Sequence, residues 1–392
     1  MVVAAVTTAE GAHGQLFALY LDQFGYGEVA IGSLASVLAI FRLVSRVPSG
    51  AAYGPDRARG QIIFWLAVFT LMTSGYAFAG GNLVVVTALT IAHGYAFGAL
   101  GTYNLAATID LTEGRRAGAT MGWYTAALST GYAIGAPAGG FVAEHLGNPA
   151  ALGIFGLLPL LAAALVLPMP KLTAPLNATP RPAGLRSLLG AHAKADPRVW
   201  LAFLIVLYIN VLSDSVDTFF PLFGLSIGIS KASSGLLKGL KSGAATFIRF
   251  ISGVLFRYLD HRAVNFWGVL LFGAATIALS YVNAYAVFVV VFVLAGVARG
   301  LLRVTSAASV AELRREGQDV GIASGIYNMG LDVGAIIGPA VGGFVGSLVG
   351  LGAMFQLVAI GSLLAYFAIS LATPQGRAAL AFRGARPARA GS

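Results

Sequence analysis

The chain has 392 residues, of which 57% are hydrophobic and only 10% are charged, and its mean hydropathy is +0.81. Because soluble domains carry about 25% charged residues, this composition indicates a polytopic membrane protein and leaves no stretch that needs a soluble domain. The sequence contains no cysteine, which excludes disulfides, iron–sulfur clusters and thiol catalysis. The net charge of +10 does not indicate nucleic-acid binding, since the basic residues lie mostly in short loops between apolar runs.

Twelve apolar segments follow one another, each near the length of about 20 residues that a membrane-spanning helix needs. They lie at 2–22, 29–52, 61–80, 83–109, 118–143, 150–168, 199–223, 232–256, 264–282, 285–310, 318–346 and 350–372. The first segment has no basic leader, so we expect a membrane span there rather than a signal peptide. The sequence therefore predicts an all-α polytopic membrane protein with twelve transmembrane helices, six in each half.

The second half of the chain repeats the first at a constant offset. The segment GWYTAALSTGYAIGAPAGGFVAEHLG at 122–147 recurs as GIYNMGLDVGAIIGPAVGGFVGSLVG at 325–350, an offset of 203 (325 − 122 = 203). Arg46 in RVPSG and Arg249 in RFISG follow the same offset (249 − 46 = 203). Matches in register at separate places indicate an internal duplication, so the halves should form two pseudo-symmetric six-helix bundles.

The repeated segment carries glycines four residues apart. This spacing leaves a bare stripe on one helix face, against which another backbone can pack closely. We expect Gly334 and Gly338 to pack against the opposite bundle, and we give Gly131 and Gly135 in the first copy a similar structural or gating role. Pro339 lies inside the second copy, and a membrane helix tolerates it because neighbouring groups can satisfy the freed carbonyl.

Lysine and arginine are distributed unevenly between the two sides of the predicted spans. With the N-terminus inside, the outside loops carry only Lys231, whereas the inside loops, linker and tail carry seventeen basic residues. This asymmetry predicts a plasma (inner) membrane protein with both termini in the cytoplasm. Residues 185–194 could form a short amphipathic helix on the inner leaflet. The predicted parts are an N-terminal bundle at 1–168, a basic, Pro-rich cytoplasmic linker at 169–198, a C-terminal bundle at 199–372 and a basic cytoplasmic tail at 373–392.

Twelve spans, two six-span halves, a long inside linker and Gly/Pro-rich fifth and eleventh spans together resemble the major facilitator superfamily over essentially the whole chain. GAIIGPAVGGF at 334–344 is similar to the G-x-x-x-G-P-x-x-G-G signature of its exporters. GPDRARG after the second span is similar to the family's D-R-x-G-R-R: Asp56 and Arg57 match, and the following Gly and Arg are displaced. The family usually has an arginine in span 4, where this chain has His93. The resemblance implies a central site lined by spans 1, 4, 7 and 10 and gated by spans 2, 5, 8 and 11.

Nothing in the sequence suggests ATP hydrolysis or another enzymatic reaction. GLLKGLKSG at 235–243 lacks the glycine–lysine pair of a phosphate-binding loop and lies within a predicted span. There is no H-E-x-x-H or G-x-S-x-G, and the five scattered histidines show no metal-ligand spacing. We therefore expect no enzymatic activity, no cofactor and no metal site, and transport driven by an ion or solute gradient.

Charged residues inside the predicted spans are the candidate functional residues, because each costs roughly 2.5–3.5 kcal/mol on insertion scales and should face a cavity or a partner. They recur at steps of three and four residues, which places them on single helix faces. The candidates for proton coupling are Glu10, His13, Asp214 and Asp217, and those for substrate binding are Phe17, Tyr20, Asn210, Lys238, Lys241, Arg299 and Arg303. The alternative is that the charges only pair with each other, for example Asp217 with Lys238, and hold the spans together.

Arg46 and Arg249 have a different expected role. They lie about two turns inside the predicted cytoplasmic boundary. We expect them to bond helix-end carbonyls at an inner gate, with substrate contact as the alternative. Asp56 and Arg57, in the loop after the second span, belong to the same gating or structural group.

These features predict a monomeric secondary active transporter that exports a small organic solute in exchange for protons by alternating access. Its partners would be the solute, protons and membrane lipids, and no nucleic acid. The many cationic residues in the predicted cavity favour an anionic or zwitterionic substrate. Alternatives on the same fold are proton-coupled uptake of an organic anion and translocation of a lipid or lysolipid. A non-transporting receptor or scaffold is a third alternative, but it would not need buried charges on three inward faces.

Overall fold

The computed structural model describes residues 1–111, 117–168, 196–256, 260–315 and 320–380. The short helix expected at 185–194 and the basic tail beyond residue 380 lie outside these residues. The described part is helical, and each of the twelve predicted spans corresponds to one long helix.

The first half contributes six long helices: α1 (Val2–Gln23), α2 (Glu28–Ala52), α3 (Ala58–Gly75), α4 (Leu83–Asp110), α5 (Ala117–Leu146) and α6 (Asn148–Val166). The second half contributes α8 (Pro197–Ser226), α9 (Lys231–Leu255), α10 (His261–Ala278), α11 (Tyr285–Arg315), α12 (Val320–Val349) and α13 (Leu351–Ala372). Short helices η1 (Pro55–Arg57), η2 (Tyr76–Phe78) and α14 (Pro374–Leu380) flank them. Asn82, Ser230 and Asp260 cap α4, α9 and α10 by accepting bonds from backbone N–H groups of the first turn.

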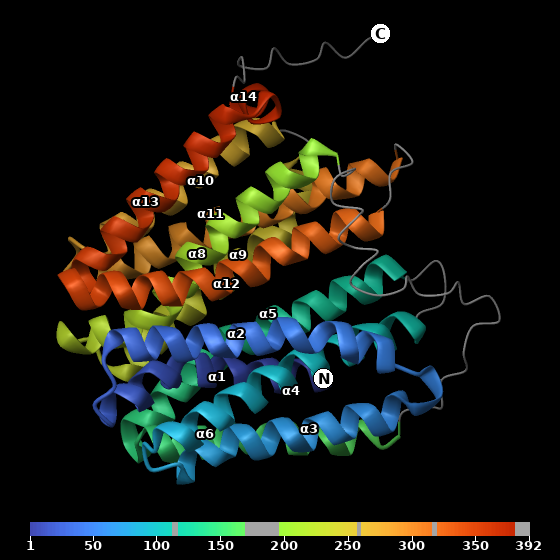
Figure 1. The fold of residues 1–392 in the computed structure, drawn as a ribbon, viewed down its shortest axis with the longest axis vertical. Coiled ribbons are helices and arrows are strands. Elements are labelled where there is room, and N and C mark those ends of the chain that lie inside the picture. The colour runs from blue at the N-terminus through green and yellow to red at the C-terminus, as the bar shows by residue number, and fades with distance from the viewer. Residues whose placement is uncertain (112–116, 169–195, 257–259, 316–319, 381–392) are drawn as a thin grey trace.

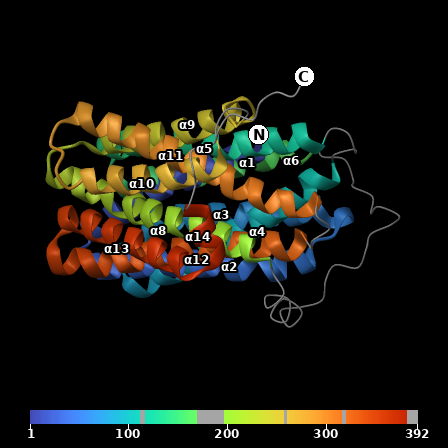
Figure 2. The same ribbon diagram turned by 90° about the horizontal axis from the view of Figure 1, so that it is seen from above.

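The helices run side by side in two groups, which correspond to the two halves of the chain (Figures 1 and 2). Eight of the described helices are long and apolar enough to cross a membrane. Many of their large apolar side chains, such as Leu161 and Phe344, are exposed on the outside of the bundles, as contact with lipid requires. The chain is a multi-pass membrane protein with two pseudo-symmetric helix bundles.

The buried hydrophobic side chains show where the two bundles meet. One core joins residues 16–21 of α1 to Phe219 and Phe220 of α8, near the α1–α2 and α8–α9 connections. At the other end of the molecule the cores are separate: one contains only first-half residues such as Tyr103, and another only second-half residues such as Val310. We call the joined end the closed end and the other the opposite end. In Figure 1 the two groups of helices diverge away from the closed end.

The glycine stripe of α12 packs inside its own bundle, so the expected contact of Gly334 and Gly338 with the opposite bundle is wrong. A Cβ on Gly338 would lie 2.6 Å from the carbonyl oxygen of Val211 on α8, and Gly334 faces the same helix. In the first half, Gly131 and Gly135 likewise face α1. The small residues therefore bring α12 against α8 and α5 against α1, the helix pairs with the most extensive contact within each bundle.

Different glycines join the two bundles at the closed end. Gly32 on α2 meets the backbone of Pro339 and Gly343 on α12. Gly235 on α9 meets the backbone of Ala136 and Pro137 on α5, and Gly140 of α5 faces the start of α9. These are equivalent positions in the duplication (235 − 32 = 203; 343 − 140 = 203). Two pseudo-symmetric seams, α2 with α12 and α5 with α9, therefore connect the bundles.

Candidate functional site

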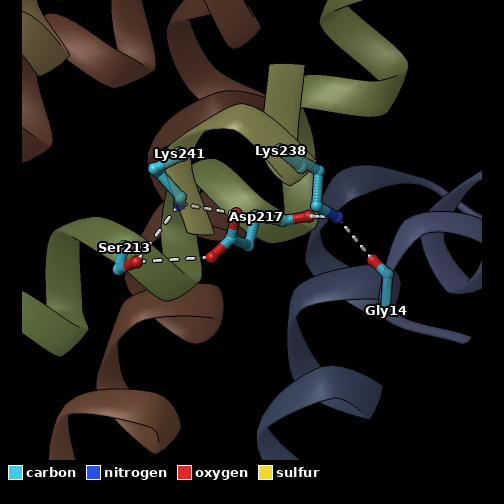
Figure 3. Close-up of polar contacts among 5 residues, drawn as sticks. All are labelled: Gly14, Ser213, Asp217, Lys238 and Lys241. Carbon is cyan, nitrogen blue, oxygen red and sulfur yellow. Dashed lines mark hydrogen bonds and ion pairs between the residues drawn. The ribbon is translucent and has the colours of Figure 1, made fainter. Parts of the chain in front are cut away.

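Lys238 and Lys241 of α9 bind different atoms of Asp217 on α8 (Figure 3). The Nζ atom of Lys241 lies 2.6 Å from Oδ1 of Asp217 and 3.2 Å from Oγ of Ser213, whose hydroxyl donates to Oδ2 of Asp217. Nζ of Lys238 donates instead to the main-chain carbonyls of Asp217 and Gly14, each at 2.8 Å. The pairing considered from the sequence, the Asp217 carboxylate with Lys238, is therefore wrong, because Lys241 takes that carboxylate.

A proline explains why Lys238 finds an available carbonyl in the middle of a helix. In α8 the carbonyl of Asp217 would normally accept a bond from residue 221, but Pro221 has no N–H. The ammonium group of Lys238 satisfies the freed oxygen. Its second bond, to Gly14 of α1, crosses between the bundles, so Lys238 ties them together just beside the shared core.

Glu10 and His93 form a second buried group within the first bundle. Oε2 of Glu10 on α1 lies 2.8 Å from Nε2 of His93 on α4, and both side chains are buried. Nδ1 of His93 lies 3.0 Å from Oγ1 of Thr73, whose hydroxyl donates to the carbonyl of Phe69 at 2.8 Å. In the sequence, His93 stood out only as a departure from the family pattern. Its partner lies 83 residues away in the chain, beyond the reach of any spacing rule.

His13 lies against this pair without joining it. Its ring stacks on that of His93 with centroids 4.1 Å apart and an interplanar angle of 23°, and its Nε2 has no hydrogen-bond partner. Candidate ligand atoms of Glu10, His13 and His93 lie within 4.8 Å of one another, a grouping that the sequence spacing did not show. Stacked rings direct their nitrogen lone pairs side by side, whereas ligands of one metal ion converge on a point. The arrangement fits a metal poorly.

Asp332 on α12 lies within ion-pair distance of two arginines from the opposite bundle. Its Oδ2 lies 2.9 Å from a terminal nitrogen of Arg46, and its Oδ1 lies 3.9 Å from Nε of Arg42, both on α2. The Asp332 carboxylate is 2% exposed and Arg46 is 39% exposed, so the carboxylate is buried in the α2–α12 seam and Arg46 binds it from a more accessible position. Arg46 therefore binds a carboxylate and not the helix-end carbonyls expected from the sequence.

Arg249 occupies the equivalent position on the other seam. A terminal nitrogen of Arg249 on α9 donates to Oγ of Ser129 on α5 at 2.9 Å. It too crosses between the bundles, and its partner is a hydroxyl rather than a carbonyl. Both symmetry-related arginines thus connect the bundles, as a gating role requires, through side chains that the sequence did not pair.

Several charged groups between the bundles lack full hydrogen bonding. Arg303 of α11 donates to Oδ1 of Asn210 on α8 at 3.0 Å, but its Nε has no partner. Nε of Arg299, one turn away, and Oδ2 of Asp214 on α8 are also without partners. Asp214 is close enough to Arg42 and Arg299 to interact with their charges. Buried polar atoms are rarely left unsatisfied without a reason, so these groups suit a bound solute.

The remaining predicted residues lie apart from this group. Phe17 and Tyr20 are buried in the shared core, where their rings contact that of Tyr76. Asp56 and Arg57 form an exposed ion pair, with Nε and Oδ2 3.9 Å apart, at the start of α3. Their proposed roles in substrate binding and gating stay predictions.

Two helix bundles around a set of buried, incompletely paired charges are the architecture of a secondary transporter. The sequence pattern of the Major Facilitator Superfamily matches residues 1–282 and 257–390. The chain belongs to that family, and it is a transporter rather than an enzyme.

Solved structures show the same fold at low sequence identity. A bacterial homologue of the human lysosomal transporter Spinster, inward-facing and occupied, has a TM-score of 0.75 and 13% identity over 98% of this chain and 97% of that one. Its unoccupied form has a TM-score of 0.70 and 15% identity, over 97% and 95%. The nucleoside transporter NupG has a TM-score of 0.73 and 14% identity, over 97% and 98%. No curated protein matches the sequence.

Proposed function

We propose that this protein couples the movement of a small organic anion to that of protons, by alternating access between the two bundles. The observation that carries the proposal is an excess of positive charge in the middle of the described helices. Away from their ends, these helices carry four carboxylates, from Glu10, Asp214, Asp217 and Asp332, against seven cations, from Arg42, Arg46, Lys238, Lys241, Arg249, Arg299 and Arg303. An anionic solute would supply the missing negative charge, since uncompensated charge away from water is costly.

The Glu10–His93 pair supports coupling to protons. The single hydrogen of the Thr73 hydroxyl is directed to Phe69, so Thr73 accepts a bond from Nδ1–H of His93. The tautomer assigned from these partners leaves Nε2 of His93 as an acceptor, 2.8 Å from a carboxylate oxygen that is also an acceptor. Two acceptors at this distance need a proton between them. The pair would therefore hold one proton when formed as described, and lose it when the partners separate.

Proton and anion should bind together in this scheme. Protonating any carboxylate between the bundles makes the site more positive, which strengthens attraction for an anion. The bound anion would then offset the positive charge that the proton adds, and the loaded site would permit the bundles to rock. With the predicted topology, the closed end faces outward and the opposite end, where the cores of the two bundles are separate, faces the cytoplasm, in a plasma membrane with both termini inside.

The test is transport in proteoliposomes. We expect that an inward proton gradient drives accumulation of labelled organic anions chosen from carboxylates and phosphate esters, and that their affinity rises as the pH falls. An affinity that falls with falling pH, or uptake restricted to cationic, neutral or lipid solutes, would contradict the proposal.

Exchange of protons for an exported solute is the second candidate. The unpartnered Oδ2 of Asp214 favours it, because a free carboxylate can bind a proton or a cationic group of a solute, but not both. In that case the solute and the proton compete, and the affinity for the solute falls as the pH falls. The same pH series therefore separates the two candidates.

A further inference from the structure

The two seams between the bundles are built on one plan but differ in charge. Arg46 and Arg249 are equivalent in the duplication, and so are their partners Ser129 and Asp332 (332 − 129 = 203). On the α2–α12 seam, Arg46 meets a carboxylate at 2.9 Å. On the α5–α9 seam, Arg249 meets a hydroxyl at the same distance. Arg249 thus lies where its symmetry mate Arg46 forms an ion pair, but the partner of Arg249 is not an anion.

Among the described residues, no carboxylate near Arg249 replaces that anion. The charged or phenolic groups that interact with it electrostatically are Arg303, Arg299 and Tyr327, and none of them is a carboxylate. Within the described part of the chain, none of Arg249, Arg299 and Arg303 forms an ion pair. Asp214 and Asp332 interact with Arg303 more weakly than Arg299 does, and Asp332 is already bound by α2. Among the described residues, the three guanidinium groups therefore repel one another, and Asp214, which also interacts with Arg299, is the one nearby carboxylate outside an ion pair.

We propose that Arg249, Arg299 and Arg303 bind a carboxylate or phosphate group of the transported solute, at the position that Asp332 fills on the other seam. The planar guanidinium group matches such oxyanions with two parallel hydrogen bonds. The Nε atoms of Arg299 and Arg303 are buried and have no partner, so donors remain for this purpose. The inference rests on the proposed anion transport and adds the place where the anionic group binds.

The site also connects binding to movement of the bundles. Arg249 bonds to α5 of the first bundle, whereas Arg299 and Arg303 lie on α11 of the second. An oxyanion held by all three would compete with Ser129 for Arg249. The solute would thereby change the contact between the bundles at the α5–α9 seam, while the ion pair of Asp332 on the other seam stays intact.

A substitution that restores the lost carboxylate tests the site. Ser129→Asp gives Arg249 an internal anion, and Ser129→Asn is the matched control of the same shape without the charge. Binding of inorganic phosphate and of succinate to the purified full-length protein is measured by thermal stabilisation, with chloride at the same ionic strength as the blank. The two probes distinguish a phosphate site from a carboxylate site.

We expect the wild-type protein and Ser129→Asn to bind at least one of the two anions. Ser129→Asp should bind it about tenfold or more weakly, which corresponds to ~1.4 kcal/mol. Equal binding by Ser129→Asp, an equal loss in both variants, or no binding by the wild type would overturn the proposal. If Ser129→Asp does not fold, Arg249→Gln replaces it, with Arg249→Lys as the charged control and the same expected contrast.

Uptake driven by a proton gradient tests the proposed anion site and the proposed function independently of each other. If the wild type accumulates an anion and Ser129→Asp does so with unchanged affinity, the site is wrong and the function stands. If the wild type accumulates no anion, the function fails irrespective of the binding data.

Discussion

At the scale of single residues, the carboxylates inside the spans differ in what they bind, and this difference divides their roles. Asp217 and Asp332 are held by cations at 2.6 and 2.9 Å. Glu10 is held by an imidazole. An ion pair with lysine or arginine stabilises the charged form of a carboxylate, whereas the imidazole can itself take up the proton. Of these three, Glu10 is therefore the carboxylate best suited to exchange a proton during transport.

Glu10→Gln should separate transport from proton coupling. The amide N–H₂ of glutamine can donate to Nε2 of His93, so the variant imitates the protonated pair permanently. We expect solute exchange between equal compartments to continue, while accumulation driven by a pH gradient falls at least about tenfold, a change of ~1.4 kcal/mol in coupling. Wild-type accumulation by Glu10→Gln would exclude this pair as the coupling site.

The Lys241–Asp217 pair should contribute mainly to stability. Lys241 is 2% exposed, so Lys241→Met leaves a carboxylate unpaired beside an apolar bundle interior. Breaking such a pair costs about 3–5 kcal/mol, and the lower value is expected here because Asp217 is 28% exposed. In the double variant Lys241→Met/Asp217→Asn most of the loss should be recovered. Unfolding midpoints in detergent, compared as a double-mutant cycle, measure this, and a double variant as unstable as the single one would refute it.

At the scale of helices, the sequence located all twelve spans but not the neighbours of their glycines. Apolar length alone defines a span, which explains the first success. Adjacent residues on a helix point about 100° apart, so one position changes the neighbour: Gly342 faces α8, whereas Gly343 faces α2. No sequence period records which helix lies in each direction. The Glu10–His93 and Arg46–Asp332 pairs could not be predicted from the sequence for the same reason, since each joins helices that are distant in the chain.

Gly343→Leu and Gly338→Leu should therefore have different effects. Gly343 lies in the contact between bundles, so a leucine there prevents the closed end from forming and should reduce transport about tenfold or more, with little loss of stability within each bundle. Gly338 lies against α8, so its leucine variant strains one bundle and should lower the unfolding free energy by about 1–3 kcal/mol. Transport assays and unfolding midpoints are measured on both variants. Unchanged transport in Gly343→Leu would contradict the claim that transport requires the close α2–α12 contact.

At the scale of the whole molecule, orientation in the membrane decides which side of the membrane the closed end faces. Lys231 is the only basic residue in the loops on the predicted outer side, and it lies at the closed end. A reporter enzyme that is active only outside the cytoplasm, fused after Ser392, should be silent, and the same reporter inserted between Ser226 and Lys231 should be active. The reverse pattern would place the closed end in the cytoplasm and invert the direction proposed above.

Alternating access requires the closed end to separate, and the absence of cysteine makes this directly testable. Glu144 of α5 accepts a bond from the backbone of Ala232 on α9 at 3.0 Å, across the closed end. Glu144→Cys/Ala232→Cys, joined by a short bifunctional thiol reagent, should lose transport and regain it when a cleavable reagent is reduced.

The matched control joins two helices of one bundle. Ser74 near the end of α3 donates to the carbonyl of Gly153 on α6 at 3.3 Å. If each bundle moves as a unit, Ser74→Cys/Gly153→Cys should keep transport after the same treatment, because this link does not span the moving interface. Transport that survives the link between Glu144→Cys and Ala232→Cys would mean that the closed end never opens. The shared core would then be a permanent contact, and the solute would need a path other than one between the two bundles.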